Sequence, residues 1–484
     1  MNRQNIWIHI TIAVIIITMA AVLGQIRRWQ STLGMFNDKS SSTTTKTTTV
    51  TKPTAVSRST KDCQPEVLVK FRPEVDLTEI KKIVAKNNDK VEDEIETVKN
   101  LISIDDLDGL EAEKVAEQYR RMSDLVLYAE PIVEIRLEPT ETFRDVTSRN
   151  NESTNLPDEF NLPNDPMFAD QWALKNNGQN GGKENADIAA PKAWEKTKGS
   201  RKVVVAVLDT GVDYLHLDLA ANMWIRPDNV PQYRDDELGV FNDLNGFNAA
   251  ENLADPMDEN GHGTHCAGVI GAEGDNDLGV AGINWQVEIM PLKFLGKGGF
   301  GSTKDAIEAI NYAVDRKQKG VNIRVISASW GSTVYSKALE DSIRAAGEAG
   351  ILFIAAAGND AGNNDKRPHY PSNYNLPNVI SVAALDRGDN LASFSNYGPK
   401  TVHIAAPGKD ILSTWLKDGY REASGTSMAT PQVSGVAGLI LANEPNITVE
   451  KLREKILKSV DKVDSLNGKI ENGGRLNAAK ALGN

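Results

Sequence analysis

The stretch from Arg201 to Asp209, "RKVVVAVLD", is an almost continuous apolar run that ends in a carboxylate. Helical patterns at 302–318 and 336–350 lie between similar runs. Strands that are buried on both faces read as continuous apolar runs. The alternation therefore predicts an α/β fold of three layers, a mostly parallel sheet covered by helices on both faces. The similar runs are "VEIMPLKFL" (287–295), "NIRVISASW" (322–330), "ILFIAAAGN" (351–359) and "NVISVAAL" (378–385).

Ligands of such sheets bind at the carboxyl ends of the strands, so the residues after each strand are the candidates for a site. Asp209 ends the first run and Asn359 ends the run that starts at Ile351. His262 lies in "NGHGTHCAG" and Ser427 in "GTSMATP", and each segment opens an apolar helical run. We therefore expect an Asp, an Asn, a His and a Ser to gather at one edge of the sheet.

These four residue types together suit nucleophilic catalysis. A serine hydroxyl is a weak nucleophile and needs a neighbouring base. Histidine can take the proton because its ordinary pKa is about 6.5, and a buried carboxylate orients the imidazole. The main-chain N–H of Ser427 at a helix start and the side chain of Asn359 could hold a developing oxyanion. The pattern predicts a Ser-His-Asp triad.

Four segments, "VAVLDTGVD", "NGHGTHCAG", "AAAGN" and "GTSMATP", resemble in this order the signature blocks of the subtilisin-like serine peptidases. The resemblance covers roughly 164–482, and "HGTHCAG" and "PNDPMFADQWAL" are most similar to the thermitase branch. It implies a serine endopeptidase that hydrolyses polypeptides through an acyl-enzyme. Gln432, where the family usually has histidine, and "HLDL" at 216–219, where "HPDL" is usual, remove no catalytic group. The resemblance makes Asp209, His262 and Ser427 the triad and Asn359 the oxyanion donor.

The same resemblance implies where a substrate binds. "SASWG" at 327–331 is similar to the segment that pairs with an extended peptide, and such pairing gives affinity with little side-chain selectivity. Small residues at 355–358 would line the main specificity pocket and leave room for a large apolar side chain. The expected substrate-binding residues are Ser329, Trp330, Gly331, Ala356, Ala357 and Gly358.

The thermitase branch also implies a calcium site. A hard cation takes roughly six to eight oxygen ligands of mixed type, which the loop "EGDNDLGV" at 273–280 can supply in part. The alternative interpretation of this loop is a solvated acidic turn. The implied ligands are the side chains of Asp165, Asp218 and Asn276 and the carbonyls of Glu273, Leu278 and Val280.

The N-terminus predicts export. Ile6–Leu23, "IWIHITIAVIIITMAAVL", carries no formal charge, is long for a signal peptide and is barely long enough to span a bilayer. Residues 1–26 are therefore either a cleaved signal peptide or a retained membrane anchor, and the protein is secreted or membrane-anchored. A Ser/Thr-rich linker follows at 27–62, because its composition cannot bury enough apolar surface to fold.

A small domain is expected at 63–139, where strand and helix patterns alternate. It is open-faced and α/β, and by pattern and position it resembles the inhibitory propeptide of the family. A polar linker at 140–162 would hold the maturation site, and 163–484 would form the peptidase domain. The chain would thus be a zymogen whose own propeptide is an intramolecular inhibitor.

Composition excludes some partners. The net charge of −12 argues against nucleic acid, which binds basic surfaces. The two cysteines, Cys63 and Cys266, fall in different predicted domains, so the chain depends on its core or on bound ions. We expect a monomer. Two alternatives remain: a catalytically silent relative that binds at a surface, against which the four intact groups argue, and a nucleotide-binding protein, against which the Asp in "DTGVDYLHLD" argues.

Overall fold

The structure is a computed structural model that describes residues 66–138, 141–145, 162–235 and 239–484. All of them belong to one compact unit, Cys63–Asn484. The predicted leader at 1–26 and the Ser/Thr-rich linker at 27–62 lie outside the described residues. None of the helices within the described ranges has the length and apolar character that crossing a membrane requires.

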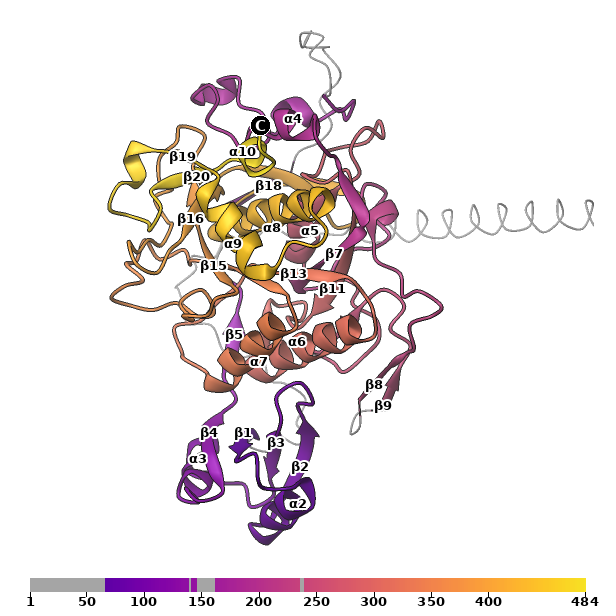
Figure 1. Cartoon of the computed structure of the whole chain (residues 1–484), viewed down its shortest axis with the longest axis vertical. Coiled ribbons are helices and arrows are strands. Elements are labelled where there is room, and N and C mark those ends of the chain that lie inside the picture. Colours follow the sequence, from indigo (N-terminus) through magenta and orange to yellow (C-terminus); the bar gives the residue numbers. More distant parts are fainter. Residues whose placement is uncertain (1–65, 139–140, 146–161, 236–238) are drawn as a thin grey trace, which may run out of the picture. The chain divides into compact units, whose positions relative to one another are not determined.

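A nine-stranded sheet forms the centre of the larger part of the unit (Figure 1). Its strands are parallel from β10 to β20, and only β19, at one edge, is antiparallel to its neighbour. This confirms the predicted fold class. The strands, in spatial order, are β10 (Phe247–Asn248), β11 (Gln286–Lys293), β7 (Gly199–Asp209), β13 (Ile323–Ala328), β14 (Leu352–Ala356), β15 (Val379–Leu385), β16 (Ile404–Pro407), β20 (Gly474–Leu476) and β19 (Val460–Lys462).

Strand β7 shows why its sequence is apolar throughout. Val203, Val205 and Val207 face one hydrophobic core, which they share with α5 (His262–Gly271) and α8 (Thr426–Asn443). The alternate residues Val204, Ala206 and Leu208 belong to a second core, shared with α6 (Thr303–Gln318) and α7 (Lys337–Glu348). Because side chains alternate across a strand, both faces of the sheet need apolar residues. The two helix layers are visible on opposite sides of the sheet in Figure 1.

The predicted helices begin where polar side chains can cap them. Ser302 accepts a hydrogen bond from the Asp305 N–H, and the Asp305 side chain accepts one from the Ser302 N–H. Ser336 caps α7 by accepting the Leu339 N–H. Such caps satisfy N–H groups that lack helical partners. Both serines were predicted as helical residues and instead lie just outside the helices.

The part from Glu66 to Arg136 has a separate four-stranded sheet. Two helices cover one face, and the other face contributes Leu68, Ile95 and Leu101 to the core that includes α6 and α7. The predicted order lacked β2, whose sequence "DKVEDE" is mostly charged and which lies at the edge of its sheet. The elements are β1 (Glu66–Phe71), α2 (Leu77–Lys86), β2 (Asp89–Glu94), β3 (Leu101–Asp106), α3 (Ala112–Arg120), β4 (Val126–Pro131) and β5 (Glu134–Arg136).

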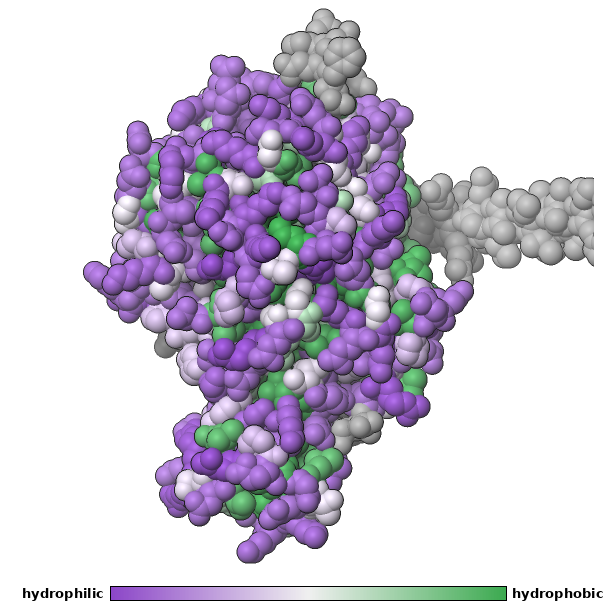
Figure 2. All heavy atoms as spheres, viewed as in Figure 1, coloured by the Kyte–Doolittle hydropathy of each residue, from purple (hydrophilic) through white to green (hydrophobic). Residues whose placement is uncertain are grey.

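Smaller elements complete the unit. Within the stretch predicted as a linker at 140–162, the residues 141–145 form β6, and the rest of that stretch up to 161 lies outside the described residues. The face seen in Figure 2 is mostly hydrophilic, with hydrophobic side chains in separated patches. The remaining elements are α4 (Ala190–Trp194), β8 (Tyr233–Asp235), β9 (Gly239–Phe241), β12 (Phe300–Ser302), β17 (Ile411–Trp415), β18 (Gly419–Ser424), α9 (Val449–Lys458), α10 (Ala478–Ala481) and four short 3-10 turns at 168–170, 179–181, 220–222 and 464–466.

Candidate active site

The predicted catalytic residues lie at the ends of elements that meet at one edge of the sheet. Asp209 is the last residue of β7, and His262 is the first residue of α5. Ser427 is the second residue of α8, and Asn359 follows β14 by three residues. The side chains of the first three are almost completely buried. This arrangement follows from the fold, since parallel strands end, and the helices after them begin, at the same edge.

His262 and Asp209 are directly bonded. The distance between His262 Nδ1 and Asp209 Oδ1 is 2.7 Å. Burial alone lowers the pKa of His262, but the charge of Asp209 and this hydrogen bond together raise it above its ordinary value. Because Nδ1 is engaged, Nε2 is the nitrogen that can exchange a proton with a substrate or a nucleophile. Nε2 is buried and has no hydrogen-bond partner among the described residues.

A buried carboxylate that the sequence analysis missed fixes the start of α5. Asp258 accepts hydrogen bonds from the N–H groups of Asn260 and Gly261 with one oxygen, and from the N–H and hydroxyl of Thr264 with the other. Gly261 has a φ of +107°, and a Cβ atom there would lie 2.4 Å from the Trp415 ring. The turn that presents His262 therefore requires glycine. The signal for Asp258 was its place just before "NGHG".

Ser427 is held by the segment that follows β13. Its hydroxyl donates to the carbonyl of Ser329 at 3.0 Å, and its own carbonyl accepts the hydroxyl of Ser329 at 2.9 Å. In this structure the hydroxyl thus bonds Ser329 and not His262. As the second residue of α8, Ser427 also has a main-chain N–H in the first turn, where helices lack internal partners and carry a positive partial charge.

Asn359 presents its amide group in a fixed orientation. Its side-chain oxygen accepts the N–H of Thr426 at 2.8 Å and the Thr426 hydroxyl at 3.0 Å. The amide nitrogen Nδ2 is buried and has no hydrogen-bond partner in the described part of the chain. Since the oxygen is occupied, this nitrogen remains as a donor beside the start of α8. A buried donor of this kind suits the stabilisation of a negative charge that forms during a reaction.

The neighbours of His262 on α5 are neutral. Burial lowers the pKa of His265 to about 4, and its Nε2 contacts the carbonyls of Ile411 and Arg421 at 3.0 and 3.1 Å. Burial raises the pKa of the free thiol of Cys266 well above its ordinary value. Both side chains therefore pack as uncharged groups, and neither supplies a thiolate nor a second base at this site.

The predicted substrate segments lie beside Ser427. Ser329 and Gly331 follow β13, whereas the Trp330 side chain is buried against Phe294, with ring centroids 4.6 Å apart. Only the main chain of Trp330 is thus available to a substrate. Ala356 ends β14, and Ala357 and Gly358 lead on to Asn359. These residues come together with Ser427 around one end of the sheet, because Gly358 N–H donates to the Thr426 hydroxyl at 3.1 Å.

Residues 134–138 and 141–145 of the chain pair with segments next to this site. Strand β5 is antiparallel to β12, and Arg136 also forms an antiparallel bridge to Gly331, in the segment that follows β13. The Leu137 N–H donates to the Gly299 carbonyl at 2.9 Å. On the other side, β6 is antiparallel to β18, whose last residue precedes Ser427 by three positions. The described residues before and after 139–140 are therefore paired like strands, as a bound peptide would be.

The residues predicted to bind calcium also gather. Asp165 accepts the Asp275 N–H at 2.7 Å, and Asp218 accepts the Asn276 side chain at 2.8 Å and the Val280 N–H at 3.0 Å. Burial raises the pKa of Asp165 to about 6 and that of Asp218 to about 7. The second oxygen of Asp165 is buried and finds no partner among the described residues. Two buried carboxylates and an unpaired oxygen suit a bound cation.

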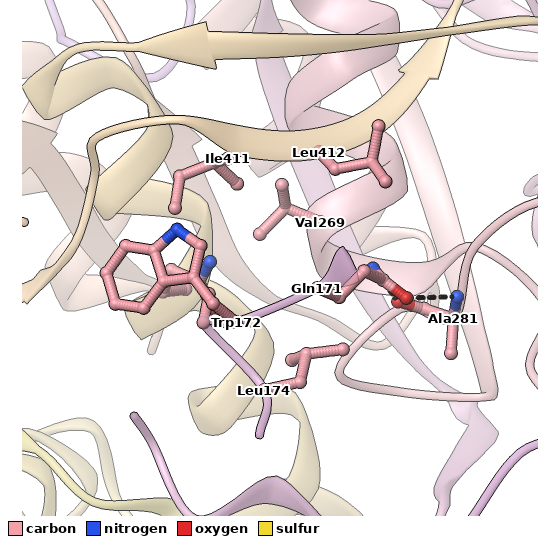
Figure 3. A pocket seen from close by; sticks show the side chains of 9 residues that line it. Gln171, Trp172, Leu174, Val269, Ala281, Ile411 and Leu412 are labelled. Carbon is pink, nitrogen blue, oxygen red and sulfur yellow. Dashed lines mark hydrogen bonds between the residues drawn. The ribbon is translucent and has the colours of Figure 1, made fainter. Parts of the chain in front are cut away.

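The loop that carries Glu273, Asn276, Leu278 and Val280 is anchored at its end. Figure 3 shows Gln171 next to Ala281 in a small pocket. The Gln171 amide accepts the Ala281 N–H at 2.9 Å and donates to the Ala281 carbonyl at 2.8 Å. These two hydrogen bonds hold the segment that follows Asp165 against the loop. The pocket is also lined by Val269 of α5, so loop and catalytic helix are packed together.

Comparisons with known proteins identify the family of the chain. The sequence model described as the subtilase family, Peptidase_S8, matches residues 200–482. The chain is 37% identical over 320 residues to thermitase of Thermoactinomyces vulgaris, covering 66% of this chain and 99% of thermitase. It is 35% identical over 295 residues to the halolysin-like extracellular serine protease Nep of Natrialba magadii, covering 61% of this chain and 48% of that protein.

Solved structures extend the likeness to a larger part of the fold. The crystal structure of fervidolysin from Fervidobacterium pennivorans, described as a keratinolytic enzyme related to subtilisin, is similar with a TM-score of 0.67. The likeness covers 88% of this chain and 62% of fervidolysin at 24% sequence identity. At that identity the comparison supports the fold alone.

Proposed function

The chain belongs to the subtilase family of serine endopeptidases, and we propose that Asp209, His262 and Ser427 are its catalytic triad, with Asn359 as an oxyanion donor. The observation that carries the assignment is the 2.7 Å bond between His262 and Asp209 beside a serine at a helix start. Family membership excludes the nucleotide-binding alternative. The enzyme hydrolyses peptide bonds in polypeptides.

The proposed reaction begins when the Ser427 hydroxyl turns from the Ser329 carbonyl to His262 Nε2. The hydroxyl oxygen attacks the scissile carbonyl carbon while Nε2 takes its proton, and Asp209 stabilises the imidazolium. The carbonyl oxygen becomes an oxyanion that accepts hydrogen bonds from Asn359 Nδ2 and the Ser427 N–H. His262 then gives the proton to the leaving amine, which leaves an acyl-enzyme. A water molecule, deprotonated by His262, hydrolyses the ester and restores Ser427.

We propose that 63–139 is the inhibitory propeptide. Its sheet contributes apolar residues to the core beside α6 and α7, and its last residues lie extended against Gly331 and Gly299. A substrate-like segment in the cleft competes with external polypeptides, which supports inhibition. The maturation site proposed within 140–161, and the peptidase domain proposed at 163–484, follow from this assignment.

Calcium is proposed as a structural cofactor. Asp165, Asp218 and Asn276 would hold it by side chains, and Glu273, Leu278 and Val280 by carbonyls. When bound, the ion would neutralise two buried carboxylates and tie the start of the peptidase domain to the loop next to α5. The buried, unpaired oxygen of Asp165 supports this proposal.

We also propose that the precursor is exported. The apolar stretch Ile6–Leu23 supports this, and a relative is named as extracellular. Whether residues 1–26 are cleaved or retained as an anchor distinguishes a secreted enzyme from a membrane-anchored one. Mass analysis of the mature protein from cells and medium separates the two.

The experiment for the triad is the intact mass of the purified precursor after incubation with calcium, beside a Ser427→Ala precursor. Each is then offered an unfolded protein. We expect the wild type to shed a fragment that ends between Thr140 and Asn161 and to digest the substrate, while Ser427→Ala does neither. A wild type that stays whole and inert, with or without EDTA, would contradict the assignment and favour a surface-binding relative.

A further inference from the structure

The pairing of residues 134–138 brings Glu138 near the segment that holds Ser427, the proposed nucleophile. Arg136 is paired antiparallel with Gly331. Continued in the same register, two residues forward from Arg136 and two residues back from Gly331, the pairing puts Glu138 opposite Ser329. The Ser329 carbonyl is the group that accepts the Ser427 hydroxyl at 3.0 Å. Within the segment 134–138, Glu138 is thus the residue closest in register to Ser427. It occupies the position of the residue before a scissile bond.

The Glu138 side chain ends on a buried histidine. Its Oε1 lies 2.6 Å from Nε2 of His369, whose side chain is only 3% exposed, while that of Glu138 is 18% exposed. Glu138 is the only carboxylate within ion-pair distance of His369 in the described ranges. A charge-assisted hydrogen bond at this distance and burial is strong, because little water screens it.

Two glycines hold the His369 ring. A Cβ atom at Gly331 would lie 1.9 Å from ring atom Cε1, and one at Gly358 would lie 3.0 Å from Cδ2. Gly358 belongs to the segment expected to line the specificity pocket, and Gly331 belongs to the segment expected to pair with the substrate peptide. The main chain of His369 is fixed as well, since its N–H donates to the Asn373 side chain and its carbonyl accepts the Ser372 hydroxyl at 2.7 Å. His369 is therefore a fixed part of this pocket.

We propose that His369 makes the pocket select glutamate as the residue before the scissile bond. The inference rests on the proposed triad, and it replaces the expectation of a large apolar side chain. An apolar side chain would bury Nε2 of His369 without a partner, which costs binding energy in a closed pocket. Glutamine could still bond Nε2 but would lack the charge, so glutamate should be preferred over both.

In the proposed propeptide, the peptide bond after Glu138 joins it to a proline. The residue after Glu138 is Pro139, which has no N–H and a fixed φ. The proposal therefore concerns recognition of the glutamate side chain and not maturation at this bond. The test uses peptides in which an amide leaving group replaces the proline.

The experiment compares four peptide para-nitroanilides, acetyl-Ile-Arg-Leu-X, with X as Glu, Gln, Leu or Lys, as substrates of the enzyme matured from the full-length precursor. The first three residues copy 135–137. We expect kcat/KM for Glu to exceed that for Gln by at least about tenfold, and those for Leu and Lys by more. A Leu or Gln peptide cleaved as well as the Glu peptide would overturn the proposal.

Variants add an independent reading. His369→Asn should bring the Glu-to-Gln ratio close to one, whereas His403→Asn should keep it, because His403 is a partly buried histidine just before β16 whose Nδ1 accepts the Ser381 N–H. A ratio that His369→Asn leaves unchanged also overturns the proposal. If His369→Asn does not fold, the comparison among peptides with the wild type still decides.

Digestion of unfolded casein by the wild type, with Ser427→Ala as the blank, separates failure of the glutamate proposal from failure of the proposed function. If casein is cut without a preference for acidic residues, only the glutamate proposal is wrong. If casein is not cut at all, the proposed triad is wrong.

Discussion

Thr426 holds the side-chain oxygen of Asn359 with two hydrogen bonds, from its N–H at 2.8 Å and from its hydroxyl at 3.0 Å. The residue before the proposed nucleophile thereby fixes the orientation of the amide that we propose as the oxyanion donor. The donor is thus in position before any substrate arrives, and such preorganisation is effective in stabilising a transition state.

Asn359→Ala should lower kcat by roughly 10²–10³-fold with little change in KM, because the lost bond forms mainly in the transition state. Steady-state kinetics on one peptide amide measures both constants. Asn364→Ala is a control from the same loop, since that side chain donates to the Ala357 carbonyl and not to the nucleophile's helix. A rise in KM at constant kcat would contradict the oxyanion role of Asn359.

Asp209→Asn should reduce kcat by about 10⁴-fold and shift the pH profile. His262 must be neutral to accept the serine proton, so activity is low below its pKa and rises above it. The charge and hydrogen bond of Asp209 raise that pKa against the opposing effect of burial. Without the charge, the acidic limb of kcat/KM should move to lower pH. A limb that stays in place would show that another group controls it.

The interface of the proposed propeptide should loosen as pH rises. Burial raises the pKa of Glu66, and that of Glu96, to about 7, from an ordinary value of 4.5. Groups with a raised pKa in the folded state stabilise it below about 4.5, and this contribution is lost as pH rises through about 7. Thermal unfolding of the Ser427→Ala precursor between pH 5 and 8 should show this loss.

A matched variant tests the assignment to these two glutamates. Glu66→Gln with Glu96→Gln removes both titrations and leaves an amide where Glu96 bonds Asn311. Its unfolding temperature should exceed that of the parent at pH 8, and the difference should shrink towards pH 5. If the unfolding temperatures of the two proteins change with pH in parallel, groups other than Glu66 and Glu96 cause the pH dependence.

Calcium removal should lower the unfolding temperature of the Ser427→Ala precursor. A ligand at about a thousand times its Kd stabilises the folded state by about 4 kcal/mol, which EDTA would abolish. Asp218→Asn should weaken the response to calcium, because one of the two buried carboxylates becomes neutral. Asp277→Asn is a control on the same loop, as Asp277 is not among the proposed ligands. Equal unfolding temperatures with and without EDTA would refute the cation site.

The sequence predicted the parts of the fold that rest on periodic burial. The apolar runs at 287–295 and 378–385 became β11 and β15, because a strand buried on both faces must be apolar throughout. Strands β2 and β18, "DKVEDE" and "GYREAS", were missed. Their charged or mixed residues lie in edge or hairpin positions, where pairing of the main chain and not burial fixes the strand.

The site residues also divide into those that the sequence predicted and those that it did not. Asp209, His262, Asn359 and Ser427 could be found because each lies within three residues of a strand end or a helix start. His369 could not, since it lies in a loop between β14 and β15 and its partner Glu138 is 231 positions away. Asp258 was missed for a related reason: its function is to bond three main-chain N–H groups, and such bonding has no repeated pattern in a sequence.

The first turn of α7 receives a carboxylate from the other part of the unit. Glu130 accepts the N–H groups of Lys337 and Ala338, at 2.9 and 3.1 Å, and the Ser336 hydroxyl. An enzyme that discards Glu130 on maturation keeps a helix whose first turn was completed by a residue it no longer has. A mature molecule that unfolds must then rebuild α7 without that help. Folding of the precursor and refolding of the mature enzyme therefore differ, because only the precursor has Glu130 to complete the first turn of α7.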